Sequence, residues 1–252
     1  MPTPGVDGRS AWTVRGFPDG FSKMYRRHLT GRPTGGNPEY SQDYWAVAAG
    51  VLAIQRLVKG ATQYWNGSGW TSITGLFLDY SSGPGIFGPA TERAVKAYQA
   101  IAVKPADGIA GPNTCKSLLH QPVNAAESQH GIPRHLLWGV IAQESAYDPG
   151  AVGFSTPYDL GLVQINTKVH PVNPRDAFDP WFALEWAATR MAQKSAAYRL
   201  KQPEELAWNL AALAHHAPGW ADYWAKYGSP PPAYATRAQD YINRVLAAAG
   251  KW

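Results

Sequence analysis

The chain has 252 residues, 45% hydrophobic and 16% charged, a balance that excludes an intrinsically disordered protein and allows one large domain or two modest ones. No run of eighteen or more apolar residues occurs, which excludes a membrane-spanning helix, and the single cysteine, Cys115, excludes an intramolecular disulfide. The formal net charge of +5 favours polyanionic partners.

The first segment, residues 1–40, is rich in glycine and proline and shows no sustained hydrophobic period. It is predicted to be an irregular arm, and its aromatic residues indicate that it packs against another surface. Charged residues interrupt its first thirty positions throughout, so no apolar stretch of a secretory signal is present. We therefore expect a protein that is made in the cytoplasm without a signal peptide.

The second segment, residues 41–121, contains an internal repeat. The sequence GIFGPATERAV at 85–95 recurs as GIAGPNTCKSL at 108–118, an offset of 23 residues. In each copy glycine permits a positive-φ turn, proline suits a first helical position, and threonine lies near a helix start. Upstream, helical spacing of apolar residues predicts an amphipathic helix that contains Val47, Val51, Ile54 and Val58.

These motifs resemble the peptidoglycan-binding domain family, a small helical module that docks on cell-wall material, and the resemblance spans most of residues 41–121. It implies wall contacts, for which Phe87, Tyr98 and Asp107 are the candidates. The chain departs from the family pattern in the longer connection at 60–82 and at two side chains. Tyr98 stands where phenylalanine is common, and Cys115 stands where the family often has tryptophan. We interpret Cys115 as a small buried hydrophobe rather than a reactive thiol.

The third segment, residues 122–252, reads as helix after helix, and a short connector at residues 121–124 joins it to the second segment. Its hydrophobic periods and its Gly/Pro breaks predict helices at 133–147, 180–199, 203–216 and 235–249. Together with the helical second segment, this pattern predicts an all-α protein in which a small helical module precedes a larger helical domain.

Glu144 is the residue of the third segment that carries the main chemical clue. On a helical wheel with Leu136 at zero, Glu144 lies at about 80°, between Val140 and Leu137 on the apolar face. A carboxylate on that face costs free energy when charged, so burial is expected to raise its pKa, as proton donation near neutral pH requires. The alternative, a glutamate at the helix end that bends out to solvent, fits this geometry equally well.

The motifs around Glu144 favour the first alternative. QES at 143–145 is followed by GLVQIN at 161–166, AHHAP at 214–218 and YINRVL at 241–246. In this order they resemble the lytic transglycosylase and goose-type lysozyme superfamily, whose domain is helical and lysozyme-like. The resemblance implies that Glu144 is the catalytic acid and that peptidoglycan glycan strands are the substrate. It also implies substrate contacts by Ser145, Tyr158, Gly161, Leu162, Val163, Gln164, Asn166, His215, His216 and Tyr241.

The chain departs from this second family pattern at three of those positions. Val163 stands where methionine is usual, and His216 replaces the expected asparagine. Asn166 stands where goose-type lysozymes carry an aspartate that helps to position water, which favours the transglycosylase over the hydrolase. Asp159 is the candidate to replace that aspartate, with a turn-capping role as the alternative.

The resemblance implies that Glu144 protonates the oxygen between MurNAc and GlcNAc while the N-acetyl carbonyl stabilises the anomeric carbon. Ionised Glu144 then acts as a base. Attack by the MurNAc C6 hydroxyl gives a 1,6-anhydro end, whereas attack by water gives the product of a muramidase.

Other classes of function fit the residues less well. No HExxH motif occurs, and His215 and His216 point about 100° apart on a helix, so neither a metal nor another cofactor is expected. The single cysteine has no paired histidine near it, which disfavours a papain-like amidase. Lysine and arginine are scattered, which disfavours a nucleic-acid partner. The main rival is a non-catalytic wall-binding or virion protein of the same fold.

A wall-cutting enzyme that has a binding module but lacks a signal peptide suggests a bacteriophage endolysin or a virion-associated lysin. Such a bacteriolytic protein is made in the host cytoplasm and reaches the wall after release or with the virion. We expect it to act as a monomer and without insertion into the membrane.

Overall fold

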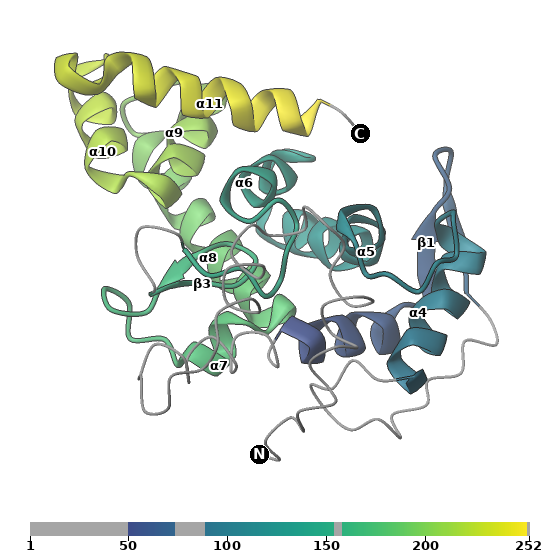
Figure 1. Ribbon diagram of the computed structural model, residues 1–252. Helices are drawn as coiled ribbons and strands as arrows, with labels where there is room; N and C mark the ends of the chain where they lie inside the picture. The colour runs from purple at the N-terminus through teal and green to yellow at the C-terminus, as the bar shows by residue number, and fades with distance from the viewer. Residues whose placement is uncertain (1–49, 74–88, 154–157, 251–252) are drawn as a thin grey trace, which may run out of the picture. The chain divides into compact units, whose positions relative to one another are not determined.

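The computed structural model describes residues 50–73, 89–153 and 158–250. These residues are mostly helical and form two short antiparallel sheets of two strands each, which confirms the predicted all-α fold class (Figure 1). In these ranges no helix has both the length and the apolar composition that crossing a bilayer requires. The predictions for residues 1–40, Val47 and Phe87 fall outside the described residues.

Two compact units make up the chain, and each is described by itself. The first unit contains the residues up to Gln121 together with Tyr147–Pro180, and the second contains Pro122–Ala146 and Trp181–Trp252. The sequence-based domain ranges, 41–121 and 122–252, stay a prediction.

The first unit begins, within the described residues, with a helix over 50–60 whose apolar side is buried, as its spacing predicted. A hairpin follows, made of β1 (Gln63–Trp65) and β2 (Trp70–Ser72). The helix α4 (Pro89–Ala102) and the start of α5 (Pro112–His130) correspond to the two copies of the repeat. Each of these two helices begins at the proline of its copy, as predicted from the repeat.

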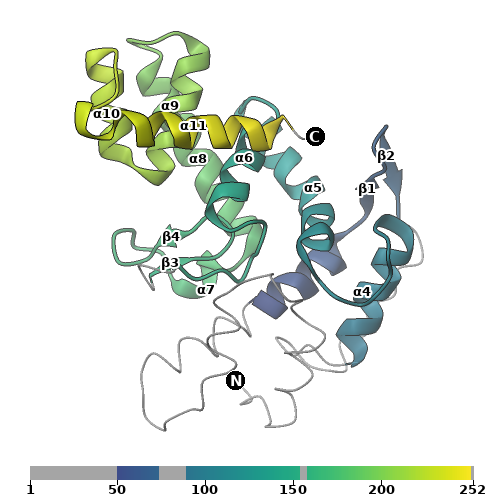
Figure 2. The same ribbon diagram turned by 45° about the horizontal axis from the view of Figure 1, so that its top comes forward.

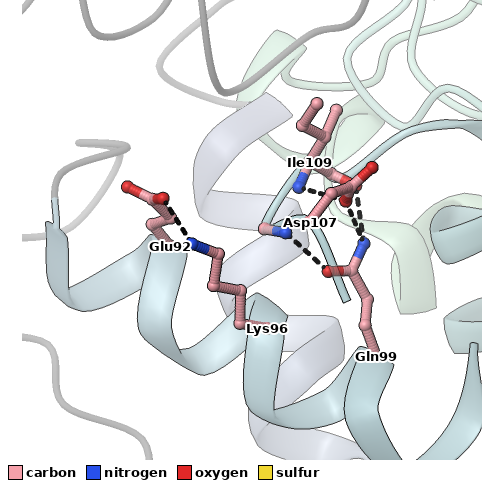
Figure 3. A network of polar contacts seen from close by, with 6 residues as sticks. Glu92, Lys96, Gln99, Asp107 and Ile109 are labelled. Carbon is pink, nitrogen blue, oxygen red and sulfur yellow. Dashed lines mark hydrogen bonds and ion pairs between the residues drawn. The ribbon is translucent and has the colours of Figure 1, made fainter. Parts of the chain in front are cut away.

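The turn between α4 and α5 is fixed by the buried side chain of Gln99 (Figure 3). Its Nε2 donates to Asp107 Oδ1 and to the Ile109 carbonyl, both at 2.9 Å, and its Oε1 accepts from the Gly108 N–H at 2.7 Å. Gly108 has a φ of +80°, which glycine adopts at little cost. The second copy of the repeat therefore has a turn that is anchored to the helix of the first copy.

The remainder of the first unit lies at 147–180 and contains a second small hairpin. Its strands are β3 (Asp159–Leu160) and β4 (Ile165–Asn166), and the short helix α7 (Pro174–Ala177) follows. Gly161 follows β3 with a φ of +74°, and a Cβ at this position would lie 2.0 Å from the Ala177 carbonyl oxygen. Only glycine allows the end of α7 to lie this close to the hairpin.

The second unit is a helical bundle in which α11 runs beside α9 and α6 in both views (Figures 1 and 2). Its core includes the whole stretch Leu136–Ile141, which is buried along α6. The elements after α5 are α6 (Leu136–Glu144), α8 (Pro180–Tyr198), α9 (Glu204–His216), α10 (Pro218–Tyr227), the 3₁₀ helix η2 (Pro232–Tyr234) and α11 (Ala235–Ala249).

The predicted connector at residues 121–124 is wrong, because these residues lie inside α5. Pro122 removes one backbone hydrogen bond, and a proline inside a helix costs about 3 kcal/mol. The flanking residues Leu119 and Val123 are fully buried, and burial of such side chains contributes about 1.5 to 3 kcal/mol each. The packing of these side chains therefore offsets the cost of the proline.

The other predicted helices agree with the structure to different degrees. Those at 180–199, 203–216 and 235–249 are confirmed to within one residue at each end. The helix at 133–147 is shorter than predicted, because residues on either side of it have left-handed backbone. His135 has a φ of 69°, and beyond Glu144 Ala146 and Tyr147 have φ values of 52° and 69°. The helix α10 was not predicted from the sequence.

Candidate active site

Glu144 is the last residue of α6, and its side chain is only 13% exposed. The side chain therefore does not extend into solvent, which was the alternative that the helical wheel left open. Its position follows from the sequence, since the stretch Leu136–Ile141 that precedes it on the same helix is buried throughout. The structure thus brings a carboxyl group to the edge of an apolar core.

Two side chains of the second unit meet Glu144 at the same oxygen. The Tyr241 hydroxyl donates a hydrogen bond of 2.7 Å to Oε1, and His216 Nδ1 lies 3.6 Å from Oε1, an ion-pair distance. The rings of His216 and Tyr241 stack on each other, with centroids 4.5 Å apart and planes 11° apart. Glu144, His216 and Tyr241, three of the predicted site residues, are therefore close together.

The pKa of Glu144 differs in direction from the sequence-based expectation. Burial raises the pKa, but contact with His216, the positive charge of His215, the hydrogen bond from Tyr241 and the charge of His216 together lower it below its ordinary value. The expectation of a raised pKa was wrong because it considered burial alone. The positive charges of His215 and His216 lower the pKa of Glu144 only while these rings are in their cationic form.

Tyr241 is held in the form that can donate to Glu144. Its burial, followed by the nearby charge of Glu144, raises its pKa well above the ordinary value. The hydroxyl therefore keeps its proton at any pH at which the protein works, and it donates to the carboxylate.

A close contact between α6 and α11 brings Tyr241 opposite Glu144. Gly139 lies so near to α11 that a Cβ at this position would be 2.2 Å from the Val245 carbonyl oxygen. The Arg244 Nε also donates to Gln143 Oε1 at 3.1 Å, one residue before Glu144. The absence of a side chain at Gly139 therefore sets the spacing of the helices that carry the two site residues.

The start of α6 is anchored by a residue that the sequence analysis missed. Glu127 is 3% exposed, and its carboxylate accepts hydrogen bonds of 2.9 Å from the backbone N–H groups of His135 and Leu137. These are N–H groups that a helix start leaves without an intrahelical partner. Burial raises the pKa of Glu127 to about 7, even though its hydrogen bonds act in the opposite direction. An acidic residue shortly before a buried helix was the only sequence signal for this role.

Ser145 caps the end of α6. Its Oγ donates to the Ile141 carbonyl at 3.3 Å, and its N–H donates to the same oxygen at 3.1 Å. Ser145 therefore fixes the end of the helix rather than bonding to the Glu144 carboxylate itself.

His215 and His216 occupy the last turn of α9 and face different neighbours. His215 meets Trp186 edge to face at 6.0 Å. His216 meets Trp220 edge to face at 6.4 Å, and Trp220 stacks on Tyr234 at 4.9 Å. Trp220 on α10 and Tyr234 in η2 were not among the predicted site residues, because neither of these elements was predicted from the sequence.

The GLVQ segment lies in the turn between β3 and β4 of the first unit. Leu162 and Val163 are buried, so they support the turn rather than offering exposed side chains. Gln164 has a φ of 52°, and its Nε2 donates to the Gly161 carbonyl at 2.8 Å and to the Ala151 carbonyl at 3.3 Å. The glutamine is thus held in a strained backbone position by contacts to the turn itself and to the segment before β3.

Three further predicted residues flank this turn. Tyr158 is 41% exposed and has the Lys168 ammonium 5.4 Å from its ring centre. Asp159 pairs with Asn166 across the two strands. The Asn166 Oδ1 accepts from the N–H groups of Lys168 and Val169 at 3.1 and 3.0 Å, so its side chain stabilises the following turn.

The three candidate wall-contact residues lie in different settings. Tyr98 is fully buried, and its hydroxyl is 2.7 Å from Ser117 Oγ, so it presents no ring at the surface. Asp107 is exposed and holds the turn shown in Figure 3. Phe87 falls outside the described residues. Cys115 is fully buried, and burial raises the pKa of its thiol well above the ordinary value, as a structural cysteine requires.

Comparison with known families assigns both parts of the chain. Residues 75–118 match the peptidoglycan binding domain family, and residues 121–219 match the transglycosylase SLT domain family. A search of curated proteins and a search of solved structures each found no match. Glu144, Gln164 and His216 fall inside the second matched range, and Tyr241 falls after it. The chain carries a peptidoglycan-binding domain followed by an SLT transglycosylase domain, and it is an enzyme that cleaves glycosidic bonds in peptidoglycan.

Proposed function

We propose that Glu144 is the general acid and base of this enzyme and that it cleaves the β-1,4 bond between MurNAc and GlcNAc. The observation that carries the proposal is a largely buried carboxyl group, 13% exposed, whose Oε1 has both Tyr241 and His216 as neighbours. With Oε1 held in this way, Oε2 is the atom that we assign to proton exchange with the substrate. A fixed carboxyl group with one oxygen directed to the substrate is what general acid catalysis needs.

The reaction begins when the protonated Glu144 gives its proton to the glycosidic oxygen, and the bond from this oxygen to the MurNAc anomeric carbon breaks. The N-acetyl carbonyl of the same MurNAc stabilises the positive charge on that carbon. The Glu144 carboxylate is itself stabilised by the Tyr241 hydroxyl, which donates to it at 2.7 Å. This contact favours the charged product of the proton transfer.

In the second step, Glu144 takes a proton from the group that attacks the anomeric carbon. We propose that this group is the MurNAc C6 hydroxyl, so that the product carries a 1,6-anhydro end. Asn166 supports this choice, because it stands where goose-type lysozymes carry an aspartate that helps to position water, and an amide cannot act as a base toward water. Asp159 is the group that would support hydrolysis instead.

The test of Glu144 uses turbidity loss of purified cell walls. Glu144→Gln keeps the size and hydrogen-bonding ability of the side chain but removes the proton exchange, so lysis is expected to fall by at least about 10²-fold. Tyr241→Phe, which keeps the stacked ring, is expected to cause a smaller loss. Lysis by Glu144→Gln at the rate of the unchanged enzyme would refute the assignment of Glu144 as the general acid and base.

Mass spectrometry of the released muropeptides tests the product. A 1,6-anhydro end is lighter by one water than the reducing end that a muramidase leaves. Reducing ends as the main product would replace the transglycosylase proposal by hydrolysis on the same site.

We also propose that the peptidoglycan-binding domain, residues 41–121, holds the enzyme on the wall, with Asp107 among its exposed residues. A bacteriophage origin, as an endolysin or a virion-associated lysin, stays a prediction, and so does the monomeric state. Neighbouring genes and the mass of the protein in solution are the respective tests.

A further inference from the structure

His216 stands where the family pattern has asparagine, and it adds a titratable group next to Glu144. Its Nδ1 lies 3.6 Å from Glu144 Oε1, and its ring lies flat on that of Tyr241, which donates to the same oxygen. An asparagine could donate a hydrogen bond from this position, but unlike an imidazole it could not take up a proton and become positively charged. The substitution therefore changes the electrostatics of the site and not only its shape.

The neighbours of His216 restrict how it can move. Tyr241 covers one face of the ring, and Trp220 meets it edge to face. His216 itself lies in the last turn of α9, where the free carbonyl groups of the helix end favour a positive charge nearby. The imidazole is thus held against Glu144 while its side chain remains 45% exposed, so it can exchange protons with water.

We propose, on the basis of the function proposed above, that His216 is a positioning residue that shares one proton with Glu144. In the ionic state the proton is on His216 Nδ1 and Glu144 is a carboxylate held by His216 and Tyr241. In the neutral state the N–H bond is broken, the proton forms an O–H bond on Glu144, and the acid is ready to donate. Glycosidic cleavage begins from the neutral state or from the doubly protonated pair, and the ionic state is the resting form.

The other charged and titratable groups near the pair act on the same balance. His215 on α9 adds positive charge that favours the Glu144 carboxylate, and Tyr241 on α11 adds a hydrogen bond with the same effect. Arg244 on α11 lies next to Tyr241 and binds Gln143. All of these remain when His216 is replaced, so the contribution of His216 can be measured separately.

The first measurement is the titration of the Glu144 carboxyl by ¹³C NMR on the full chain, in the unchanged protein and in His216→Asn. Loss of the positive neighbour is expected to raise the pKa of Glu144 by about one unit, the lower end of the range for an opposite charge at this distance. His216→Gln is the second variant, in case one of the two folds poorly. An unchanged Glu144 titration in both variants overturns the proposal.

The second measurement is the pH profile of kcat/KM on soluble glycan fragments. The positive charge on protonated His216 lowers the fraction of Glu144 that carries a proton, and the His216→Asn variant lacks this effect. The activity of the variant divided by that of the unchanged protein is therefore expected to rise by up to about tenfold as the pH falls from 9 to 5. A merely structural role scales activity by the same factor at every pH. A ratio that stays constant within about twofold, or that decreases on acidification, overturns the proposal.

The control is His130→Asn, which removes a histidine that pairs with Glu185 at 2.9 Å elsewhere in the second unit. Its activity ratio is expected to be independent of pH. The function proposed for Glu144 fails on a different result, full lysis by Glu144→Gln. The two proposals can therefore fail separately.

Discussion

Replacing Gly139 by alanine tests whether the spacing of α6 and α11 sets the geometry of the candidate active site. A Cβ at position 139 would lie 2.2 Å from the Val245 carbonyl oxygen, and ordinary contacts begin at 3.4 Å. The two helices must therefore separate locally by about 1 Å or distort. Because the atom in the way belongs to the backbone, rotation of a side chain cannot relieve the clash.

The expected cost follows from this displacement. Overpacking of a core costs about 1 to 3 kcal/mol, and alanine regains up to about 1 kcal/mol through its better helix propensity. We expect the free energy of unfolding to fall by about 1 to 2 kcal/mol. The Tyr241 to Glu144 hydrogen bond, now 2.7 Å, would lengthen beyond hydrogen-bonding distance, and a misplacement of about 1 Å can reduce activity by about 10²-fold.

Urea unfolding followed by tryptophan fluorescence measures the first effect, and clearing of purified walls measures the second. Gly219→Ala in α10 is the matched control, because nothing lies within 4 Å of a Cβ at that position. The control should keep both stability and activity. If Gly139→Ala unfolds at the same urea concentration as the unchanged protein and clears walls at the same rate, the argument from helix spacing is refuted.

Three further changes test the packing around both units. Gly161→Ala combines a φ of +74° with a backbone clash at 2.0 Å, so thermal unfolding should show that the free energy of unfolding falls by about 2 to 4 kcal/mol. Its control is Gly131→Ala, which has a positive φ but open space around the Cβ and should lose only about 1 kcal/mol. Glu127→Ala removes the acceptor of the His135 and Leu137 backbone N–H groups, the second of which is buried, and should cost about 2 kcal/mol in urea unfolding. Asp148 is fully buried, and burial raises its pKa to about 8, so the folded protein binds more protons than the unfolded chain between about pH 4 and 8. The free energy of unfolding of the protein should therefore fall as the pH rises through this window, by up to about 1.4 kcal/mol per pH unit. In Asp148→Asn the midpoint of unfolding should depend less on pH.

The sequence alone predicted those helices whose apolar residues recur at helical spacing within a single segment. The helices at 180–198 and 235–249 follow from apolar spacing between clear breaks, and Glu144 was placed on the apolar face of its helix by the same reasoning. The exceptions arise at prolines. Pro122 was interpreted as a break although it lies inside α5, and Pro218 was interpreted as a break although it is the first residue of α10. A proline has the same local geometry at a helix start and in a turn, so the sequence alone does not distinguish them.

The partners of Glu144 needed the structure, because they lie far along the chain. Tyr241 is 97 residues from Glu144, and the two meet only because Gly139 lets α11 approach α6. Family resemblance named His216 and Tyr241 as substrate contacts, but it gave no reason to expect both on one oxygen. Glu127 was missed for a different reason, because it is near His135 and Leu137 in the chain but its role depends on the turn that brings α6 back toward α5.

A lowered pKa opposes an acid role in the free enzyme, but the charge balance at Glu144 predicts that binding of the substrate raises this pKa again. In the free enzyme, burial raises the pKa and the histidines and Tyr241 lower it, with the second group of effects the larger. A bound glycan would exclude water from the 45% exposed His216 side chain, which disfavours its charged form and so weakens the largest lowering effect. The alkaline limb of kcat, which reports the bound enzyme, should therefore lie at higher pH than that of kcat/KM, which reports the free enzyme. Steady-state rates on soluble glycan fragments between pH 4 and 9 measure both limbs. Coincident limbs, or a kcat limb at lower pH, would mean that substrate binding leaves the balance at Glu144 unchanged or shifts it toward the carboxylate.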